Sequence, residues 1–154
     1  MAKKKSPTGI ISNRKARFDY DLEESLVVGI QLTGAETKSL RQHHGHIKGA
    51  YVTVRDGELW LTNSTITGDN RIQVPEDEHT RPRKLLAKKK EIEQLVAAKQ
   101  QGRSIIPLEI LSRTRYIKLR IAVGKGKKLY DKRQTIKNRE DKREAGRAIK
   151  QHSR

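Results

Sequence analysis

Residues 124–128, with the sequence Gly-Lys-Gly-Lys-Lys, could bind a phosphate backbone. The two glycines leave the chain free to adapt, so three ammonium groups can approach phosphates in varied geometries, and each neutralised phosphate releases counterions. Tyr130 follows among charged residues, where its ring could stack on an unpaired base. The alternatives are a solvated basic linker for the lysines and a ring packed on the edge of a sheet for Tyr130. We favour RNA contact for the lysines and leave both interpretations open for Tyr130.

Three histidines, His43, His44 and His46, lie within four residues and are candidates for binding a transition metal. No carboxylate stands next to them, and they follow a predicted helix at a place that rarely holds a preformed triad. We therefore favour a surface or phosphate-facing turn and predict no metal and no cofactor. The sequence also lacks the G-x-S-x-G, Walker and H-E-x-x-H patterns. We expect that the protein is not an enzyme.

The positive charge is concentrated at the two ends of the chain. Residues 125–154 contain twelve Lys or Arg and four Asp or Glu, a net +8, and residues 1–17 contain six Lys or Arg and no acid. Of the formal +17, residues 18–124 therefore carry only +3. We predict a basic N-terminal arm (1–17), a nearly neutral folded domain (18–124) and a basic C-terminal tail (125–154). Two cationic ends on a neutral core suit a long polyanion such as RNA.

The composition predicts one small domain. The chain has 154 residues, of which 33% are apolar and 34% charged. It contains no cysteine, which excludes disulfides and permits a reducing compartment. The N-terminus lacks the apolar stretch of a signal peptide, and no window approaches the roughly 18 consecutive apolar residues that a membrane helix needs. We expect a cytoplasmic protein without a membrane segment.

Alternating apolar residues predict several short strands. Residues 20–32 alternate, and residues 50–54 and 58–63 alternate around Asp56-Gly57, a strong hairpin signal. A second antiparallel pair is expected at 104–111 and 116–123. Five or six strands without a βαβ rhythm predict an antiparallel barrel or sandwich, and an oligonucleotide-binding (OB) type barrel fits.

Two helices are expected beside these strands. Thr33 and Glu36 have the spacing of a capping box, which predicts a short helix over residues 34–42. The apolar spacing within residues 88–101, ended by Gly102, predicts an amphipathic helix. Between the two, the polar residues 68–83 are expected to form a mobile loop.

The ends of the chain are expected to be flexible. Residues 1–17 contain a lysine run with Pro7 and Gly9 and are predicted to form a flexible arm. Residues 131–150 have fair helix propensity and i,i+3 ion pairs, but too few apolar residues to hold a helix on the core. We predict a tail that is disordered when free and helical when RNA neutralises its charge.

The chain resembles the SsrA-binding protein family, also called small protein B, the partner of transfer-messenger RNA in bacterial ribosome rescue. Five segments carry the resemblance, in the order found in that family: 13–20 (N-R-K-A-R-F-D-Y), 32–41 (L-T-G-A-E-T-K-S-L-R), 50–58 (A-Y-V-T-V-R-D-G-E), 81–86 (R-P-R-K-L-L) and 124–133 (G-K-G-K-K-L-Y-D-K-R). One departure is Val27-Val28-Gly29, where family members often have Glu-Ala-Gly.

The resemblance implies a six-stranded antiparallel OB-type barrel with flanking short helices. It also implies a monomeric adaptor that binds the tRNA-like domain of transfer-messenger RNA one to one and delivers it to stalled ribosomes for trans-translation. The basic tail would enter the decoding centre and the messenger channel, and only an empty channel would accommodate it.

The resemblance also assigns site residues. Those on or near the RNA-binding surface would be Asn13, Arg14, Lys15, Arg17, Glu36, Lys38, Ser39, Arg83, Lys84, Lys88, Lys125, Lys127 and Lys128. Those of the ribosome-sensing tail would be Tyr130, Asp131, Lys132, Arg133 and Ile136. Glu36 is an acid beside RNA, so capping and orienting its neighbours is an alternative to phosphate contact.

Two other functions are compatible with parts of the pattern. A structural ribosomal protein with an OB-type barrel would share the basic ends and the barrel. An RNA-modifying or RNA-cleaving metalloenzyme would depend on His43, His44 and His46.

Overall fold

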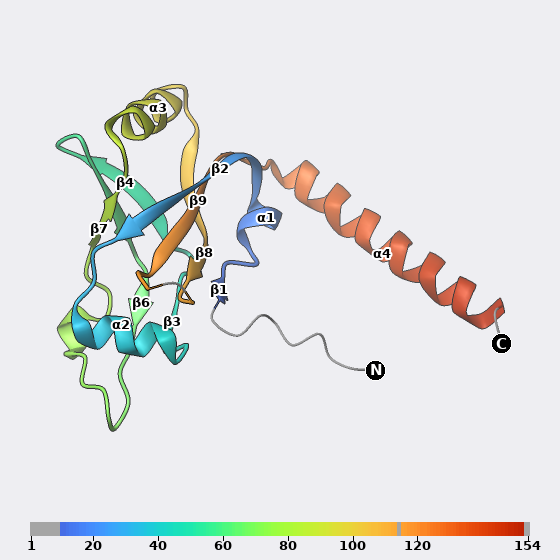
Figure 1. Cartoon of the computed structure of the whole chain (residues 1–154). Helices are drawn as coiled ribbons and strands as arrows, with labels where there is room; N and C mark the ends of the chain where they lie inside the picture. Colours follow the sequence, from blue (N-terminus) through green and yellow to red (C-terminus); the bar gives the residue numbers. More distant parts are fainter. Residues whose placement is uncertain (1–9, 114, 153–154) are drawn as a thin grey trace.

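The computed structural model describes residues 10–113 and 115–152, which form a mainly β body with a long C-terminal helix projecting from it (Figure 1). The strands are β1 (Ile10–Ser12), β2 (Tyr20–Ile30), β3 (Gly45–His46), β4 (Tyr51–Arg55), β5 (Glu58–Thr62), β6 (Thr65–Ile66), β7 (Arg83–Leu86), β8 (Ser104–Leu111) and β9 (Lys118–Gly126). The helices are α1 (Ala16–Asp19), α2 (Gly34–Arg41), the 3-10 helix η1 (Glu76–Glu78), α3 (Lys89–Gln100) and α4 (Leu129–His152).

Six strands form a closed ring of antiparallel pairs. The order of the main sheet is β1-β8-β4-β5-β7-β2-β9, and an additional β8–β9 pairing closes the ring between β8 and β9. β1 lies outside the ring and pairs with the end of β8, where Ile11 faces Ile110. β3 and β6 form a separate two-stranded sheet. The mainly β class, the antiparallel pairing and the six strands of the ring agree with the prediction, and β1 adds a seventh strand beside the ring.

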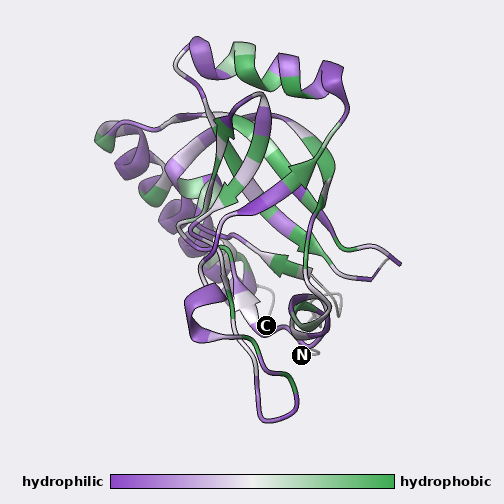
Figure 2. Ribbon diagram, turned by 90° about the vertical axis from the view of Figure 1, so that its left-hand side faces the viewer, coloured by the Kyte–Doolittle hydropathy of each residue, from purple (hydrophilic) through white to green (hydrophobic). Residues whose placement is uncertain are grey.

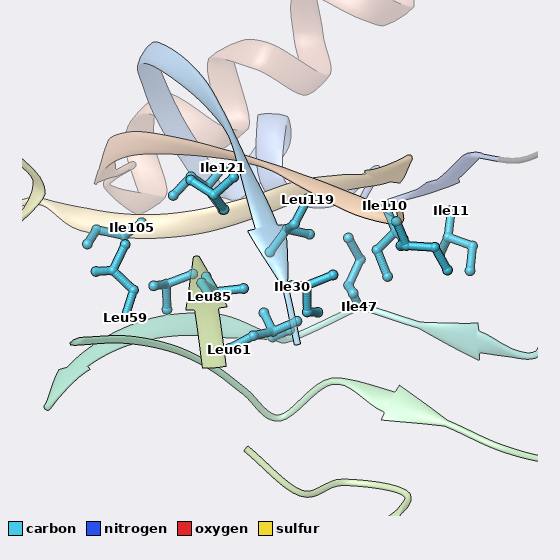
Figure 3. Packing of buried hydrophobic residues seen from close by; sticks show 14 of the residues in the cluster. Ile11, Ile30, Ile47, Leu59, Leu61, Leu85, Ile105, Ile110, Leu119 and Ile121 are labelled. Carbon is cyan, nitrogen blue, oxygen red and sulfur yellow. The ribbon is translucent and has the colours of Figure 1, made fainter. Parts of the chain in front are cut away.

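Branched aliphatic side chains fill the ring. Leu59, Leu61, Leu85, Leu119 and Ile121 are almost completely buried and lie together between the strands (Figure 3). Figure 2 shows that apolar residues gather on the strands, whereas α4 is mainly hydrophilic. Burying each such Leu or Ile side chain contributes about 1.5–3 kcal/mol, so this cluster is the main source of stability in a body with few aromatic residues.

The two predicted helices are confirmed, and they lie at opposite ends of the body (Figure 1). The Thr33 hydroxyl accepts a hydrogen bond from Glu36 N (3.3 Å) and caps α2, while Leu40 anchors the helix in the core. Lys88 N donates to the Glu91 carboxylate (2.9 Å) at the start of α3. α3 ends before Gly102, whose φ of +82° suits a residue without a side chain.

The predicted flexible arm differs from the structure over residues 10–17. Ile11 is buried through the pairing of β1 with β8, and Ala16 of α1 is buried as well. The basic residues between them hid this packing, because a three-residue strand is too short to show a periodic pattern. Residues 1–9 of the predicted arm lie outside the described residues.

The predicted loop at residues 68–83 is confirmed up to Pro82, but it is anchored on the body, and its mobility stays a prediction. Ile72 and Val74 are buried, Glu76–Glu78 form η1, and β7 begins at Arg83. The high polarity of this segment concealed these buried anchors.

Residues 129–152 form the helix α4, at the place where the sequence predicts a tail that becomes helical with RNA. The disorder expected for the free tail stays a prediction. α4 has no buried residue, so apolar packing does not hold it. Its composition favours a helix instead, because Gly146 is its one glycine and it contains no proline. Among the described residues, none of the helices combines the length and apolar character required to cross a membrane.

Candidate nucleic-acid interface

A buried ionic cluster joins α2 to β7. Both Glu36 and Arg83 have a relative exposure of 0%. The Glu36 carboxylate accepts hydrogen bonds from Arg83 Nε (3.1 Å) and from Arg81 Nε and Nη2 (2.6 and 3.0 Å). Burial lowers the pKa of the Arg83 guanidinium, and the nearby Glu36 charge opposes that shift. The charges of Glu36 and Arg83 are therefore satisfied inside the protein.

The remaining donors of Arg83 fix the segment before β7. Its Nη1 donates to Ser64 Oγ (2.9 Å) and to the Arg81 carbonyl (3.1 Å), and its Nη2 donates to the carbonyls of Glu78 and His79 (both 3.1 Å). One buried guanidinium thus organises the polar segment that leads into β7. Both side chains lie behind the surface rather than on it, and for Glu36 the geometry agrees with the alternative of orienting its neighbours.

Asn13 and Ser39 are also buried rather than on the surface. Asn13 joins the N-terminal segment to β8, because its Nδ2 donates to the Pro107 carbonyl (3.1 Å) and its N donates to the Leu108 carbonyl (2.7 Å). Asn13 Oδ1 and Ser39 Oγ are buried without a hydrogen-bond partner. Of the predicted RNA-binding residues, four are therefore behind the surface: Asn13, Glu36, Ser39 and Arg83.

Six of the predicted cations gather where α1 meets the end of β9, and we name this group the basic junction. Its members are Arg14, Lys15, Arg17, Lys125, Lys127 and Lys128. The pairing of β2 with β9 places Tyr20 opposite Gly126, and Lys127 N donates to the Asp19 carbonyl (2.9 Å). Lys127 Nζ donates to the Arg17 carbonyl (3.3 Å), whereas the other five side chains are exposed. The contact between Lys127 and Arg17, which lie 110 positions apart in the sequence, brings the two basic segments side by side.

A surface hollow of about 360 Å³ lies beside the basic junction. Its lining includes Lys15, Tyr20 and Lys48, with Asn13 at its wall. Lys48 was not predicted, because an isolated exposed lysine has no signal in the sequence that separates it from other surface lysines.

A second hollow of about 790 Å³ has exposed apolar residues at its edge. Val27 is 40% exposed and Leu86 is 54% exposed, and Lys84 and Lys88 line the same hollow. Lys84 is paired with Glu58 across 2.8 Å. Leu86 was missed as a candidate, although its place after Arg83-Lys84-Leu85 puts it on the outward parity of β7. Lys38 lies exposed on α2, at the opposite end of the body from α3 (Figure 1), so the predicted cations form more than one surface.

The predicted tail residues form the first turns of α4. Tyr130 is 75% exposed, which excludes the alternative of a ring packed on the edge of the sheet. Asp131, Arg133 and Ile136 are exposed too, while Lys132 is half-buried and pairs with Asp19 (3.2 Å). Arg139 lies over the ring of Phe18, 5.7 Å from its centroid. The contacts of Phe18 and Asp19 with the tail had no signal in the sequence.

The three neighbouring histidines do not converge on one point. Within residues 10–113 and 115–152, no group of three His, Cys, Asp or Glu side chains could hold a metal ion. His43 has a φ of +64° in the turn after α2, and His44 Nδ1 lies 4.0 Å from Asp69. Hydrogen bonds from the backbone of Arg71 and Ile72 lower the pKa of Asp69. The absence of a metal stays a prediction, and the geometry gives the metalloenzyme alternative no support.

Comparison of the whole chain with known proteins identifies its family. The family model described as SmpB protein matches residues 10–151. An SsrA-binding protein of Trichormus variabilis is 42% identical over 145 residues, covering 93% of this chain and 94% of the relative. One from Clostridium botulinum is 41% identical over 155 residues, covering 100% and 99%.

A solved structure gives the same result. A chain described as "tmRNA-SmpB: a journey to the center of the bacterial ribosome" is 35% identical, with a TM-score of 0.64, and the match covers 79% of this chain and 86% of that one. The matches extend over nearly the whole chain and include both β1 and α4. This chain belongs to the SmpB family.

Proposed function

We propose that the protein is a non-enzymatic RNA-binding adaptor. It binds the tRNA-like domain of transfer-messenger RNA and delivers that RNA to stalled ribosomes for trans-translation. The observation that carries the proposal is the match to the SmpB family over residues 10–151, together with relatives that are named SsrA-binding proteins. The similar solved structure, which contains SmpB with transfer-messenger RNA, supports the same partner. An adaptor of this kind acts in the cytoplasm and needs no cofactor.

The six-stranded ring is the platform in this proposal. A closed antiparallel ring with a helix at each end is compatible with an OB-type barrel, a fold that often binds oligonucleotides. The basic junction supplies the main phosphate contacts, because its cations are mostly exposed and lie on adjacent segments. Lys84 and Lys88 contribute at the second hollow, where Leu86 offers an apolar surface to a base or ribose.

Four predicted contacts act indirectly in this proposal. Glu36 and Arg83 hold α2 against the segment before β7, and Asn13 holds the N-terminal segment against β8. Ser39 is buried on the inner side of α2. These residues support the RNA-binding surface from behind rather than donating to phosphates.

The tail acts on the ribosome rather than on the tRNA-like domain. α4 carries Tyr130 and Arg133 on an exposed helix with no buried residue, so this surface remains available to a second RNA. Tyr130, Asp131, Lys132, Arg133 and Ile136 form the segment that we assign to the decoding centre and the messenger channel.

A truncation separates the two parts. A chain ending at Lys128 keeps all six cations of the basic junction and removes α4. We expect it to bind transfer-messenger RNA as the full chain does, but to fail to support peptide tagging on a ribosome stalled at the end of a messenger. Binding is measured by filter retention at several salt concentrations, and tagging by incorporation of the tag peptide.

Two outcomes contradict this proposal. Loss of RNA binding in the truncated chain removes the division between body and tail. Sequencing of the RNA that copurifies with the full chain tests the partner independently, and an absence of transfer-messenger RNA enrichment contradicts the proposed function.

A further inference from the structure

The aromatic side chains of this protein lie outside its buried core. The chain contains one Trp, four Tyr and one Phe, all within the described residues, and none of these six is buried. The core cluster consists of Ile, Leu, Val and Ala instead. Aromatic side chains usually supply much of the energy of a core, so their position at the surface indicates another role.

Tyr51 and Trp60 share the outer face of β4 and β5. Leu59 and Leu61 belong to the core cluster of Figure 3, so Trp60 between them points outward. On β4 the buried neighbour is Val52, which places Tyr51 on the same outward face. Tyr51 is 47% exposed and Trp60 is half-buried, so both rings are accessible from outside the ring of strands.

The strand register sets the two rings diagonally across the β4–β5 pair. Thr62 lies opposite Tyr51, and Thr53 lies opposite Trp60. Side chains in this diagonal relation are about 7–8 Å apart. The hydroxyl oxygens of the two threonines lie within hydrogen-bonding distance of each other (3.3 Å), so small side chains occupy the other diagonal. We name Tyr51, Thr53, Trp60 and Thr62 the aromatic face.

The aromatic face lies between two of the surface hollows. Ala50 directly precedes Tyr51 and lines the hollow of about 360 Å³ beside the basic junction. On the other side, Lys84 of β7 lies opposite Trp60 and lines the hollow of about 790 Å³. An RNA held at both hollows would therefore pass along the aromatic face.

Cations lie near both ends of β4. Lys48 is exposed three residues before Tyr51, and Arg55 is exposed at the last position of the strand. Glu58, the one acid in β4 or β5, is paired with Lys84 across 2.8 Å, so its charge is compensated. Accessible rings with cations at either end fit the bases and phosphates of a single strand, because every base has a face that can stack on an aromatic side chain.

We propose that the aromatic face binds two successive unpaired bases of transfer-messenger RNA, one on Tyr51 and one on Trp60. This inference rests on the proposed function, in which the same RNA is held at the basic junction and at the second hollow. Lys48 and Arg55 contact the phosphates on either side of the two bases. Sheet surfaces with aromatic residues on neighbouring strands bind single-stranded RNA in the same manner.

The fluorescence of Trp60 reports directly on this face, because Trp60 is the one tryptophan in the chain. The first probe is a single-stranded hexamer of adenylate, added to the full chain. We expect it to quench Trp60, since a base stacked on the indole ring shortens its excited state. The control probe is inorganic polyphosphate of the same charge, which has no bases and should leave the fluorescence unchanged. Equal quenching by both probes would show a response to charge alone and overturns the stacking proposal.

Substitutions of Tyr51 test the second ring while Trp60 remains as the reporter. Tyr51→Leu keeps an apolar side chain but removes the ring, and it should weaken binding of the hexamer about fivefold or more. The matched control, Tyr51→Phe, keeps the ring and should leave the affinity within about twofold. Circular dichroism verifies that both variants are folded. An equal affinity of the two variants removes Tyr51 from the contact.

Transfer-messenger RNA itself tests the source of the two bases. It should quench Trp60 on binding without ribosomes, with a Trp60→Phe chain as the background. Binding by filter retention with no change in Trp60 fluorescence overturns the assignment to this RNA. Quenching that requires added ribosomes also overturns it and assigns the aromatic face to ribosomal RNA.

The outcomes for the aromatic face are distinguishable from those for the proposed function. If the unchanged chain does not bind transfer-messenger RNA, the proposed function fails, and with it the assignment of this partner. The response of Trp60 to the adenylate hexamer still decides whether the aromatic face binds bases.

Discussion

Arg83 illustrates how one residue can mislead when only its type is considered. It lies in the segment Arg81-Pro82-Arg83-Lys84, which reads as a basic surface patch, yet its side chain is fully buried. A buried guanidinium without a partner would cost several kcal/mol, and here Glu36 and five neighbouring oxygens remove that cost. Its contribution is to the shape of the surface.

Removing the buried carboxylate should therefore destabilise the protein strongly. We expect Glu36→Gln to lower the free energy of unfolding by about 3–5 kcal/mol, because Arg83 would remain charged inside the protein without its partner. Urea denaturation followed by circular dichroism measures the change.

The control for this effect is an exposed pair of the same type. Glu58→Gln removes the partner of Lys84. The side chain of Glu58 is 44% exposed and that of Lys84 is 34% exposed. Its expected effect is below about 1 kcal/mol. Equal effects of the two substitutions would show that burial does not determine the strength of the Glu36 cluster.

At the scale of elements, regular patterns were predictable and short segments were not. The hairpin around Asp56-Gly57 and the capped helix α2 follow from local chemistry, and both are confirmed. β1 and β6, with three and two residues, are too short to show alternation, and β7 begins with a buried arginine that breaks the apolar pattern. Tertiary contacts create these segments, so local sequence could not reveal them.

The candidate site shows the same division. The basic clusters were visible in the sequence, but their arrangement was not, because it depends on the pairing of β2 with β9. That pairing brings Arg17 next to Lys127, while Lys38 lies on α2 and Lys88 directly precedes α3, and these two helices lie at opposite ends of the body (Figure 1). Charge could be counted in advance, whereas burial and proximity required the fold.

α4 offers a direct test of helicity without RNA. Gly146 lies within the helix, and a Cβ added there would meet no atom within 4 Å. Replacing it with Ala should stabilise the helix by about 1 kcal/mol, because Gly loses more backbone entropy on folding than Ala does.

The measurement is the far-ultraviolet circular dichroism of the full chain minus that of the chain ending at Lys128. A helical difference spectrum without RNA would contradict the disorder predicted for the free tail, and the Gly146→Ala substitution should then increase the helical amplitude at raised temperature. A random-coil difference spectrum, both for the unchanged chain and for the Gly146→Ala variant, would support the prediction of a tail that folds only on RNA.

At the scale of the whole molecule, the folded ring is nearly neutral and most of the positive charge lies at the two ends of the chain. Residues 18–124 carry only +3 of the formal +17, and the ring lies within this nearly neutral region apart from the end of β9. The cations of the two chain ends meet at the basic junction, so two sequence regions act as one electrostatic surface. Affinity for RNA should accordingly depend on salt through the number of phosphates that this surface neutralises.

Replacing Arg14, Lys15 and Arg17 together by Gln should weaken RNA binding and reduce its salt dependence. The slope of log K against log salt concentration should fall by up to about three charges. The matched control replaces Lys137, Lys142 and Arg147 of α4 by Gln, which removes the same charge from the tail and should leave the slope for the isolated tRNA-like domain unchanged. A slope unaffected by the first triple substitution would remove these residues from the contact.

The closure of the ring between β8 and β9 has a consequence for synthesis. β9, Lys118–Gly126, pairs on both sides, with β2 and with β8, so a chain that ends before β9 cannot complete the ring. A chain interrupted before Lys118 would present two unpaired strand edges, which are templates for aggregation. An incomplete copy of this protein is thus itself a hazardous product, of the kind whose tagging the proposed function serves.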